Sequence, residues 1–294
     1  MSITTPSTVP MKTAAGSRQQ RYRLGSSDEV AVATLAEEVA LALTINQVAH
    51  AVMMVSPLSL ELFALGFLFN EGVIADPDEI RDMALQSPET QDQRVADKAL
   101  SPLILDITLS SRASHRYRHD GVIRRRMAGC GVCGTEQLHQ AFPELQSNSP
   151  QPLPDLSAMG DLHHKFSILQ QQRGDFGGLH AAVLLNTSGQ VITFQEDIGR
   201  HNAMDKAIGY ALAQQLDLSQ HSIVMSSRCS VELVYKAVRA GLRCLTHLSS
   251  PSYQAIAVAK AHNLNLTQQL RNGEHRIFHQ NAQALQLSES NHEA

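Results

Sequence analysis

The chain has 294 residues, of which 43% are apolar and 18% charged, and its formal net charge is −4 at pH 7. This composition is typical of a globular protein of one large or two modest domains, and it argues against a disordered chain or a general nucleic-acid binder. The sequence contains no apolar run long enough to span a bilayer and no signal-peptide core, so we expect neither a membrane nor nucleic acid as partner. Four cysteines are too few for a disulfide scaffold and indicate a reducing, cytoplasmic setting.

The first half of the chain predicts an α+β region over residues 26–150, behind a loose polar tail over residues 1–25. The expected elements are a strand that begins at Val30, a second strand from Glu37 to Val48, a helix over residues 59–69 that ends near Gly72, and a strand over residues 103–109. Residues 143–154 contain several prolines and are expected to form a linker.

The second half, residues 151–280, reads as alternating strands and helices before a C-terminal tail over residues 281–294. The expected elements are a hairpin of residues 180–186 and 190–195, a helix around residues 203–212, a strand over 222–226, a helix that stops at Gly241, a strand over 242–248, a helix over 251–262 and a strand over 264–270. Strands that alternate with helices of this length favour a mixed or parallel sheet covered by helices.

Two thiols three positions apart, Cys130 and Cys133, stand among three glycines and lie shortly after three arginines at 124–126. Glycine leaves the sulfur without a bulky neighbour, and nearby guanidinium groups favour the thiolate, which is the nucleophile. This spacing also forms half of many zinc sites, but Cys229 and Cys244 provide no second closely spaced pair. A thioredoxin-like role is a further alternative, although the loop does not open a helix after a buried strand.

Cationic residues follow two of the predicted strands. Arg200, His201 and Lys206 stand where a strand gives way to a helix, and Arg228 stands at the next strand–helix junction. Helix starts present unpaired N–H groups, so these junctions suit a phosphate or pyrophosphate. The alternative is a capped helix with a salt-bridge cluster, and Cys229 is expected to be a small packing residue.

His180 opens the predicted hairpin after two glycines. Zinc nucleobase deaminases carry His-x-Glu before a Pro-Cys-x-x-Cys motif. Here Ala182 stands in place of the glutamate, and the dithiol motif precedes the histidine, so hydrolytic deamination is not expected.

Together these residues resemble the FdhD family of formate dehydrogenase accessory proteins. The matching segments are Asn46 with Met53-Met54, Gly66-Phe67-Leu68, Glu71-Gly72-Val73-Ile74, residues 129–134, residues 178–182, residues 196–203 with Asp205-Lys206, and Ser227-Arg228 with Glu232 and Lys236. They occur in the family's order between about residues 30 and 280.

The resemblance implies an α/β fold, with a cytidine-deaminase-like three-layer core and a smaller N-terminal α+β subdomain, in a homodimer without a structural metal. It implies a sulfurtransferase that takes persulfide sulfur from a cysteine desulfurase and delivers it to the molybdenum bis-molybdopterin guanine dinucleotide cofactor before insertion into formate dehydrogenase. Cys130 would carry the persulfide and Cys133 would assist transfer or resolve it. A non-covalent cofactor chaperone and a zinc-stabilised structural protein are the alternatives.

The family's cofactor-binding stretch matches Gln269-Leu270-Arg271-Asn272-Gly273-Glu274. Family members often carry an aromatic residue in place of Gln269, which cannot stack on a guanine as phenylalanine can. The predicted cofactor-binding residues are therefore those of this stretch together with His180, Arg200, His201, Lys206 and Arg228.

Overall fold

The computed structural model describes residues 17–23, 30–87, 102–119, 145–173 and 177–281. Cys130, the predicted persulfide carrier, and Cys133, predicted to assist transfer or resolve the persulfide, lie outside these residues, as does the end of the C-terminal tail after Asn281. Among the helices of the described part, none combines the length and the apolar character needed to cross a bilayer.

The N-terminal region contains a two-stranded ribbon and a four-stranded sheet of order β4-β3-β6-β5. Its elements are β1 (Ser17–Arg23), β2 (Val30–Ala36), β3 (Val39–Ile45), β4 (Val48–Val55), α1 (Leu60–Glu71), a 3-10 turn (Pro77–Glu79), β5 (Ile80–Gln86), β6 (Leu103–Leu109) and α2 (Ser111–His119). The sheet is mixed, because β3 runs parallel to β6 while β3–β4 and β5–β6 are antiparallel.

The C-terminal region is built on a six-stranded sheet of order β12-β11-β10-β9-β7-β8. Its elements are α4 (Leu162–Arg173), β7 (His180–Leu185), β8 (Val191–Asp197), α5 (Arg200–Ala213), a 3-10 turn (Leu218–Gln220), β9 (Ser222–Met225), α6 (Val231–Arg239), β10 (Cys244–His247), α7 (Tyr253–Ala261), β11 (Asn265–Gln269) and β12 (His275–His279). Strands β9, β10 and β11 are parallel, β7 and β12 are antiparallel to them, and β8, which pairs antiparallel with β7, runs in the same direction as β9.

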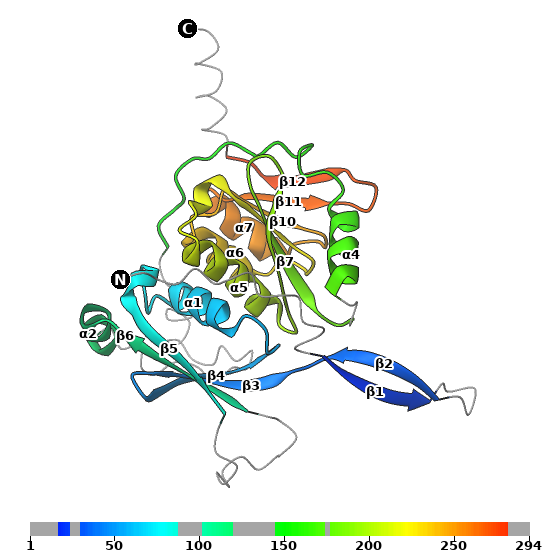
Figure 1. The fold of residues 1–294 in the computed structure, drawn as a ribbon. Helices are drawn as coiled ribbons and strands as arrows, with labels where there is room; N and C mark the ends of the chain where they lie inside the picture. Colours follow the sequence, from blue (N-terminus) through cyan, green and yellow to red (C-terminus); the bar gives the residue numbers. More distant parts are fainter. Residues whose placement is uncertain (1–16, 24–29, 88–101, 120–144, 174–176, 282–294) are drawn as a thin grey trace.

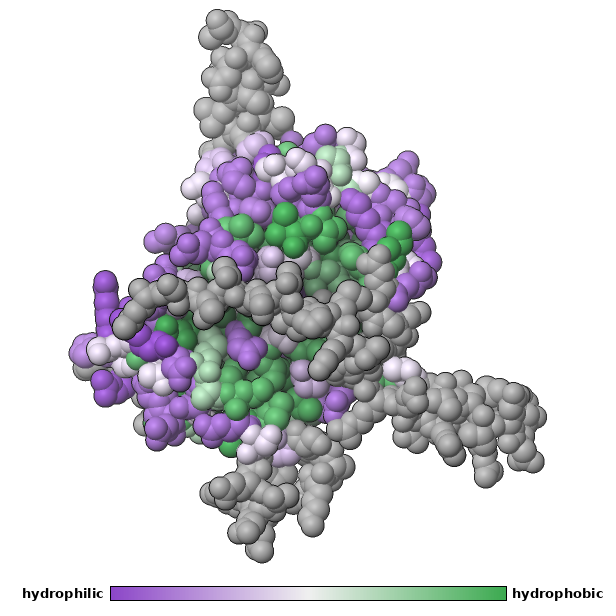
Figure 2. All heavy atoms as spheres, viewed as in Figure 1, coloured by the Kyte–Doolittle hydropathy of each residue, from purple (hydrophilic) through white to green (hydrophobic). Residues whose placement is uncertain are grey.

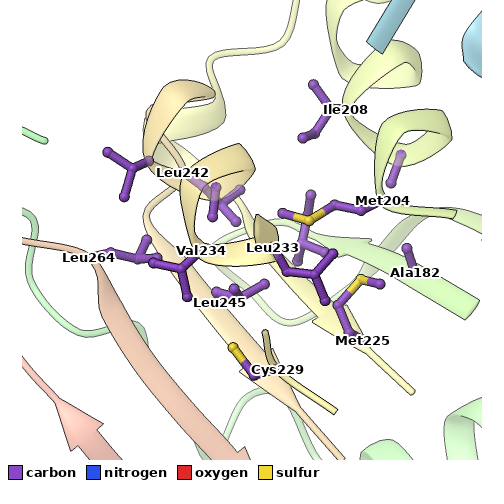
Figure 3. Packing of buried hydrophobic residues seen from close by; sticks show 14 of the residues in the cluster. Ala182, Met204, Ile208, Met225, Cys229, Leu233, Val234, Leu242, Leu245 and Leu264 are labelled. Atoms are coloured by element: carbon purple, nitrogen blue, oxygen red, sulfur yellow. The ribbon is translucent and has the colours of Figure 1, made fainter. Parts of the chain in front are cut away.

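Helices cover both faces of the six-stranded sheet, which gives a three-layer core (Figure 1). On one face, β-strand side chains such as Ala182 and Leu245 pack with Met204 of α5 and Leu233 of α6, as Figure 3 shows. On the other face, Phe166 of α4 packs with Ala181, Val183 and Phe194. The predicted α/β class with a three-layer core and a smaller N-terminal α+β region is confirmed.

Helix α1 joins the two regions because it packs on the four-stranded sheet with one side and on α5 with the other. Two glycines allow this close crossing. A Cβ atom on Gly66 would lie 1.9 Å from the carbonyl oxygen of Asp205, and one on Gly209 would lie 1.9 Å from that of Leu62. This double-sided burial explains why the sequence of α1 is apolar on more than one face.

The structure differs from the sequence-based elements at several places. The single strand expected from Glu37 to Val48 is wrong: β3 ends at Ile45, and the chain turns at Asn46 and Gln47, both at positive φ, before β4 begins. A strand, β1, lies within the stretch expected to be a loose tail. The elements α4, β5 and β12 had no counterpart in the prediction, because their sequences are largely polar on their exposed sides.

The surface character differs between the two regions. In Figure 2 the rim of the six-stranded unit is largely hydrophilic, whereas apolar side chains gather over the four-stranded sheet and α1. Val52 and Met54 on β4 and Leu85 on β5 are 53%, 39% and 47% exposed.

Candidate functional site

The predicted binding residues of the described part lie along one edge of the six-stranded sheet. The carboxyl ends of β9, β10 and β11 meet there, together with the first residues of β7 and β12 and the end of β8. His180 at the start of β7 pairs with Asp197 at the end of β8, and Gln269 of β11 pairs with His275 of β12. Ligands of open α/β sheets bind at such carboxyl edges.

This edge, from here on called the binding edge, is long. From β8 to β11 there are four strand-to-strand steps, which correspond to about 19 Å at the usual spacing of roughly 4.8 Å. Arg200 and His201 stand near the β8 end, Arg228 follows β9, and residues 269–274 form the β11 end. The edge therefore presents separate cationic positions along one line, as an extended ligand with several phosphates requires.

At the β8 end, the start of α5 and the start of α6 are joined by a pair of side chains. Nε2 of His201 lies 2.7 Å from Oε2 of Glu232, and this contact lowers the pKa of the Glu232 carboxyl. Nearby, burial and the positive charges of Arg200 and His201 lower the pKa of His180. His180 is therefore neutral at neutral pH and can accept or donate a hydrogen bond at this edge.

Lys206 does not face this edge. Its side chain and that of Asp197 are both fully buried, and Nζ lies 2.6 Å from Oδ2 of the carboxylate. Nζ also donates to the carbonyl oxygens of Ser56 at 3.2 Å and Glu196 at 3.1 Å. The ammonium group of Lys206 is therefore buried in the protein interior. It is not exposed to make the cofactor contact that was predicted for Lys206.

Asp197 is the centre of the same buried network. Its oxygens accept from the backbone N–H of Ser56 at 3.0 Å and of Gly199 at 2.9 Å, and from Nδ2 of Asn202 at 2.8 Å. Asn202 Nδ2 also donates to the carbonyl of Met54 at 2.9 Å. The network, from here on called the buried clasp, ties the end of β4 to the end of β8 and the start of α5.

The sequence did not predict that Asp197, Asn202 and Ser56 form one hydrogen-bonded network. The alternative reading of the Arg200 segment, a helix start with a salt-bridge cluster, describes part of it, but the cluster is buried rather than solvated. Asp197 and Lys206 stand nine residues apart, a spacing without a recognisable pattern, and only the folded chain brings in Ser56 from more than a hundred residues away.

At the β9 end, Arg228 is exposed while its neighbours are not. Cys229 is 2% exposed and packs in the core on the α5–α7 side, and burial raises the pKa of its thiol to about 12. The expectation that Cys229 is a packing residue is confirmed. Below this loop, buried His247 has its Nδ1 atom 3.0 Å from the carbonyl oxygen of Ser227, and burial lowers its pKa to about 4.

At the β11 end, residues 270–274 form a tight turn. The N–H of Leu270 donates to Glu274 O at 2.7 Å, the N–H of Gly273 donates to Leu270 O at 3.0 Å, and Asn272 Nδ2 donates to the Glu274 carboxylate at 2.7 Å. Gly273 has φ of 84°, which favours glycine at that position. Arg271 is exposed beside it.

Gln269 differs from the rest of its stretch, because its side chain is buried and satisfied within the protein. Its Oε1 accepts from the N–H of Leu162 at 2.6 Å, and its Nε2 donates to the Gly160 carbonyl at 2.7 Å. His275 Nε2 lies 3.0 Å from the same Nε2 atom. Gln269 therefore connects the start of α4 to the end of β11. Its buried side chain can influence a ligand only by positioning these neighbouring residues.

In the described part of the chain, no group of three or more histidine, cysteine or acidic side chains has the arrangement of a metal site. Its two cysteines, Cys229 and Cys244, are buried free thiols, and burial raises the pKa of Cys244 to about 11. Neither is suited to nucleophilic sulfur chemistry at neutral pH.

The fold and the edge together define a three-layer α/β protein with an extended, cation-bearing sheet edge. Comparison with protein families matches residues 36–285 to the FdhD/NarQ family. The chain belongs to this family.

Two relatives named sulfur carrier protein FdhD illustrate the similarity. The one from Acinetobacter baylyi is 32% identical over 260 residues, covering 87% of this chain and 89% of that protein. The one from Burkholderia cenocepacia is 34% identical over 252 residues, covering 82% and 86%.

Among solved structures, a candidate formate dehydrogenase accessory protein from Desulfotalea psychrophila aligns with a TM-score of 0.65 at 20% identity, covering 89% of this chain and 95% of that one. This similarity shows the shared fold. A guanine deaminase from Nitrosomonas europaea aligns with a TM-score of only 0.31 over 50% of this chain, and we draw nothing from it.

Proposed function

We propose that this protein is a sulfur carrier and sulfurtransferase of formate dehydrogenase maturation. It takes persulfide sulfur from a cysteine desulfurase and transfers it to the molybdenum bis-molybdopterin guanine dinucleotide cofactor before the cofactor enters formate dehydrogenase. The names of its relatives support the carrier role. We further propose that it works in the cytoplasm as a homodimer.

The observation that carries this proposal is the gathering of His180, Arg200, Arg228 and the residue 269–274 turn on one sheet edge. A bis-dinucleotide carries two pyrophosphates, so it needs cations at separated positions. Guanidinium groups bind phosphate oxygens through paired hydrogen bonds, and helix starts add N–H donors. The cofactor is the cargo of this edge.

The chemistry falls to Cys130 and Cys133. The Cys130 thiolate attacks the outer sulfur of the desulfurase persulfide, the donor S–S bond breaks, and the donor cysteine leaves as thiolate. Attack of Cys133 on the inner sulfur of the Cys130 persulfide then releases the outer sulfur as hydrosulfide for the metal. The electrons for this release come from the two thiols, which become a disulfide that a cellular dithiol must reduce before the next cycle.

Mass spectrometry of the full chain after incubation with a cysteine desulfurase and cysteine tests the proposal. We expect Cys130 to gain the mass of one sulfur atom and Cys130→Ala to gain none. In cells, Cys130→Ala should abolish formate dehydrogenase activity while the protein remains folded. Full activity with Cys130→Ala would contradict the assignment of the carrier.

A second candidate is a cofactor chaperone without covalent sulfur chemistry. The observation in its favour is that the binding edge needs no thiol to hold an anion, because it presents exposed Arg228 and Arg271 and partly exposed Arg200. Cofactor binding by a protein that never gains sulfur on Cys130 would support the chaperone and exclude sulfur transfer.

A further inference from the structure

Helix α2 differs in charge from the protein as a whole. The protein has a net charge of −4, whereas the nine residues of α2 include three arginines, two histidines and no acidic residue. In Figure 1, α2 lies at one end of the four-stranded sheet, away from the six-stranded sheet. Its positive charge is therefore separate from the cations of the binding edge.

One side of α2 is fixed to the N-terminal region. Ala113 and Tyr117 are buried in the core between the four-stranded sheet and α1. Oγ of Ser114 accepts a hydrogen bond from Nδ2 of Asn46 at 3.0 Å, and the hydroxyl of Tyr117 lies 3.0 Å from Nδ1 of His50. These contacts hold the helix in one orientation, with its other side toward the surface.

The outward side of α2 is formed by Arg112, His115 and Arg118, all of which are exposed. Successive steps of three residues place neighbouring side chains on one face of a helix. Arg112 and Arg118 are separated by about 9 Å along the helix axis, at a rise of roughly 1.5 Å per residue. These three residues are from here on called the basic face.

The acidic side chain that pairs with α2 does not neutralise the basic face. Glu79 accepts hydrogen bonds from both terminal nitrogens of Arg116, at 2.8 and 2.6 Å, and these bonds lower the pKa of its carboxyl. Arg116 is not part of the basic face. Within the described residues, neither Arg112 nor Arg118 has a hydrogen-bonding partner or a close ion pair for its guanidinium group.

Helix stability accounts for only part of this charge. Arg118 stands in the last turn of α2, where the helix dipole favours a cation. Arg112 stands in the first turn, where the same dipole disfavours one. An exposed cation in an unfavourable position, with no close partner in the described residues, is a departure from local rules of the kind found at functional sites.

The charge changes along the helix. Asp76 and Asp78 line a cleft of about 530 Å³ at the start of α2, together with Arg81 and Arg112. Arg118 does not line this cleft. The surface is therefore mixed in charge at the start of α2 and positive toward its end, so a docked surface must be acidic opposite Arg118.

We propose that the basic face docks an acidic surface of the protein that donates persulfide sulfur to Cys130. Charge complementarity of this kind acts mainly on the rate and the orientation of encounter. A nucleic acid suits the surface less well, because the net charge of −4 repels a long polyanion.

This inference rests on the proposed function for the identity of the partner, and it adds the surface on which that partner is held. In the sequence, Cys130 follows His119, the last residue of α2, by eleven positions. Eleven residues span at most about 40 Å. A donor seated on α2 therefore has its persulfide within reach of the carrier thiol, and the docking itself involves no covalent step.

The test is the rate at which the full chain gains sulfur on Cys130 from the purified cysteine desulfurase of the same organism and cysteine, followed by mass spectrometry. We expect the double variant Arg112→Glu/Arg118→Glu to load about tenfold more slowly than the wild type at about 0.1 M salt, because steering is lost. At about 1 M salt the Debye length falls to roughly 3 Å, and the two rates should converge.

Two controls isolate the docking step. The persulfide of N-acetylcysteine amide is a small uncharged donor that needs no docking surface, so it should load the wild type and the α2 variant equally fast. Lys260→Glu/Arg276→Glu changes the net charge by the same amount at exposed positions of α7 and β12, and it should load from the desulfurase as the wild type does.

A wild-type loading rate of the α2 variant with the desulfurase would overturn the docking proposal and leave sulfur transfer intact. Slower loading from the small donor as well would assign the defect to the carrier thiol, and equal slowing in the α7/β12 control would assign it to net charge. Either result would also overturn the docking proposal.

Equilibrium binding of the desulfurase to the same proteins separates this inference from the proposed function. If the wild type binds the desulfurase but never gains sulfur, and the α2 variant binds it about tenfold more weakly, docking on α2 is supported and sulfur transfer is contradicted. A wild type that does not bind the desulfurase would overturn the docking proposal.

Discussion

The buried clasp and the binding edge lie side by side, and both draw charged residues from the segment that joins β8 to α5. Lys206 and Asp197 are fully buried and satisfy each other, whereas Arg200 and Arg228 reach the surface. The difference shows that charged residues of one sequence motif take two structural roles. One part holds the two sheets of the protein together, and the other part reaches the surface at the binding edge.

Removal of one partner from the buried clasp should have the largest effect. Lys206→Met leaves Asp197 buried without its cation, and a broken buried ion pair of this kind costs about 3–5 kcal/mol. Urea unfolding should show this loss, with the midpoint shifted and the protein still folded in water. Lys260→Met, on an exposed position of α7, is the control and should change the free energy of unfolding by less than about 0.5 kcal/mol.

Gly66→Ala tests whether the crossing of α1 and α5 sets the position of the clasp. Alanine normally stabilises a helix relative to glycine by about 1 kcal/mol, but here its Cβ would meet the Asp205 carbonyl at 1.9 Å. We expect a net loss of about 1–3 kcal/mol in unfolding free energy. An increase in stability would show that α1 and α5 can move apart to accommodate the methyl group without a loss of packing energy.

His247 should make the stability depend on pH. Its pKa is lowered to about 4 by burial, so the unfolded chain binds a proton that the folded chain does not between about pH 6.5 and pH 4. Stability is therefore complete above pH 6.5 and falls as the pH drops through that window, by up to about 3 kcal/mol.

His247→Asn keeps a donor for the Ser227 carbonyl and removes the titration. Its stability should change less than that of the wild type between pH 7 and pH 5, measured by urea unfolding at each pH. His180, whose pKa burial also lowers, adds a smaller slope that both proteins share. Equal slopes in the two proteins would exclude His247 as the source.

Of these variants, Arg228→Ala should change the stability least. Its effect should fall on ligand binding at the binding edge. Because Arg228 is exposed, its loss should change unfolding by less than about 0.5 kcal/mol. GDP binding should weaken by about tenfold and depend less on salt, since one cation–phosphate contact is gone. Arg228→Lys should restore part of the affinity, and unchanged binding in Arg228→Ala would remove it from the site.

The sequence by itself determined the α/β class, the alternating elements from residue 180 to residue 270 and the cationic junctions, because apolar periodicity and helix starts are local signals. It also singled out the dithiol of Cys130 and Cys133, which lies outside the described residues. The polar elements α4 and β12 were not predicted, because their own sequences lack a clear apolar periodicity. Tertiary contacts such as the hydrogen bond between Gln269 and Leu162 position them.

Only the tertiary structure decided which charged residues lie at the surface of the binding edge and which are buried. Lys206 and Arg200 are six positions apart in one motif, yet a helix of 3.6 residues per turn, packed between α1 and the sheet, buries Lys206 and leaves Arg200 partly exposed. The buried carboxylate of Asp197 pairs with the ammonium of Lys206, because a charged group removed from water is stable only beside an opposite charge. Long-range packing, and not the residue type, assigned each cation its role.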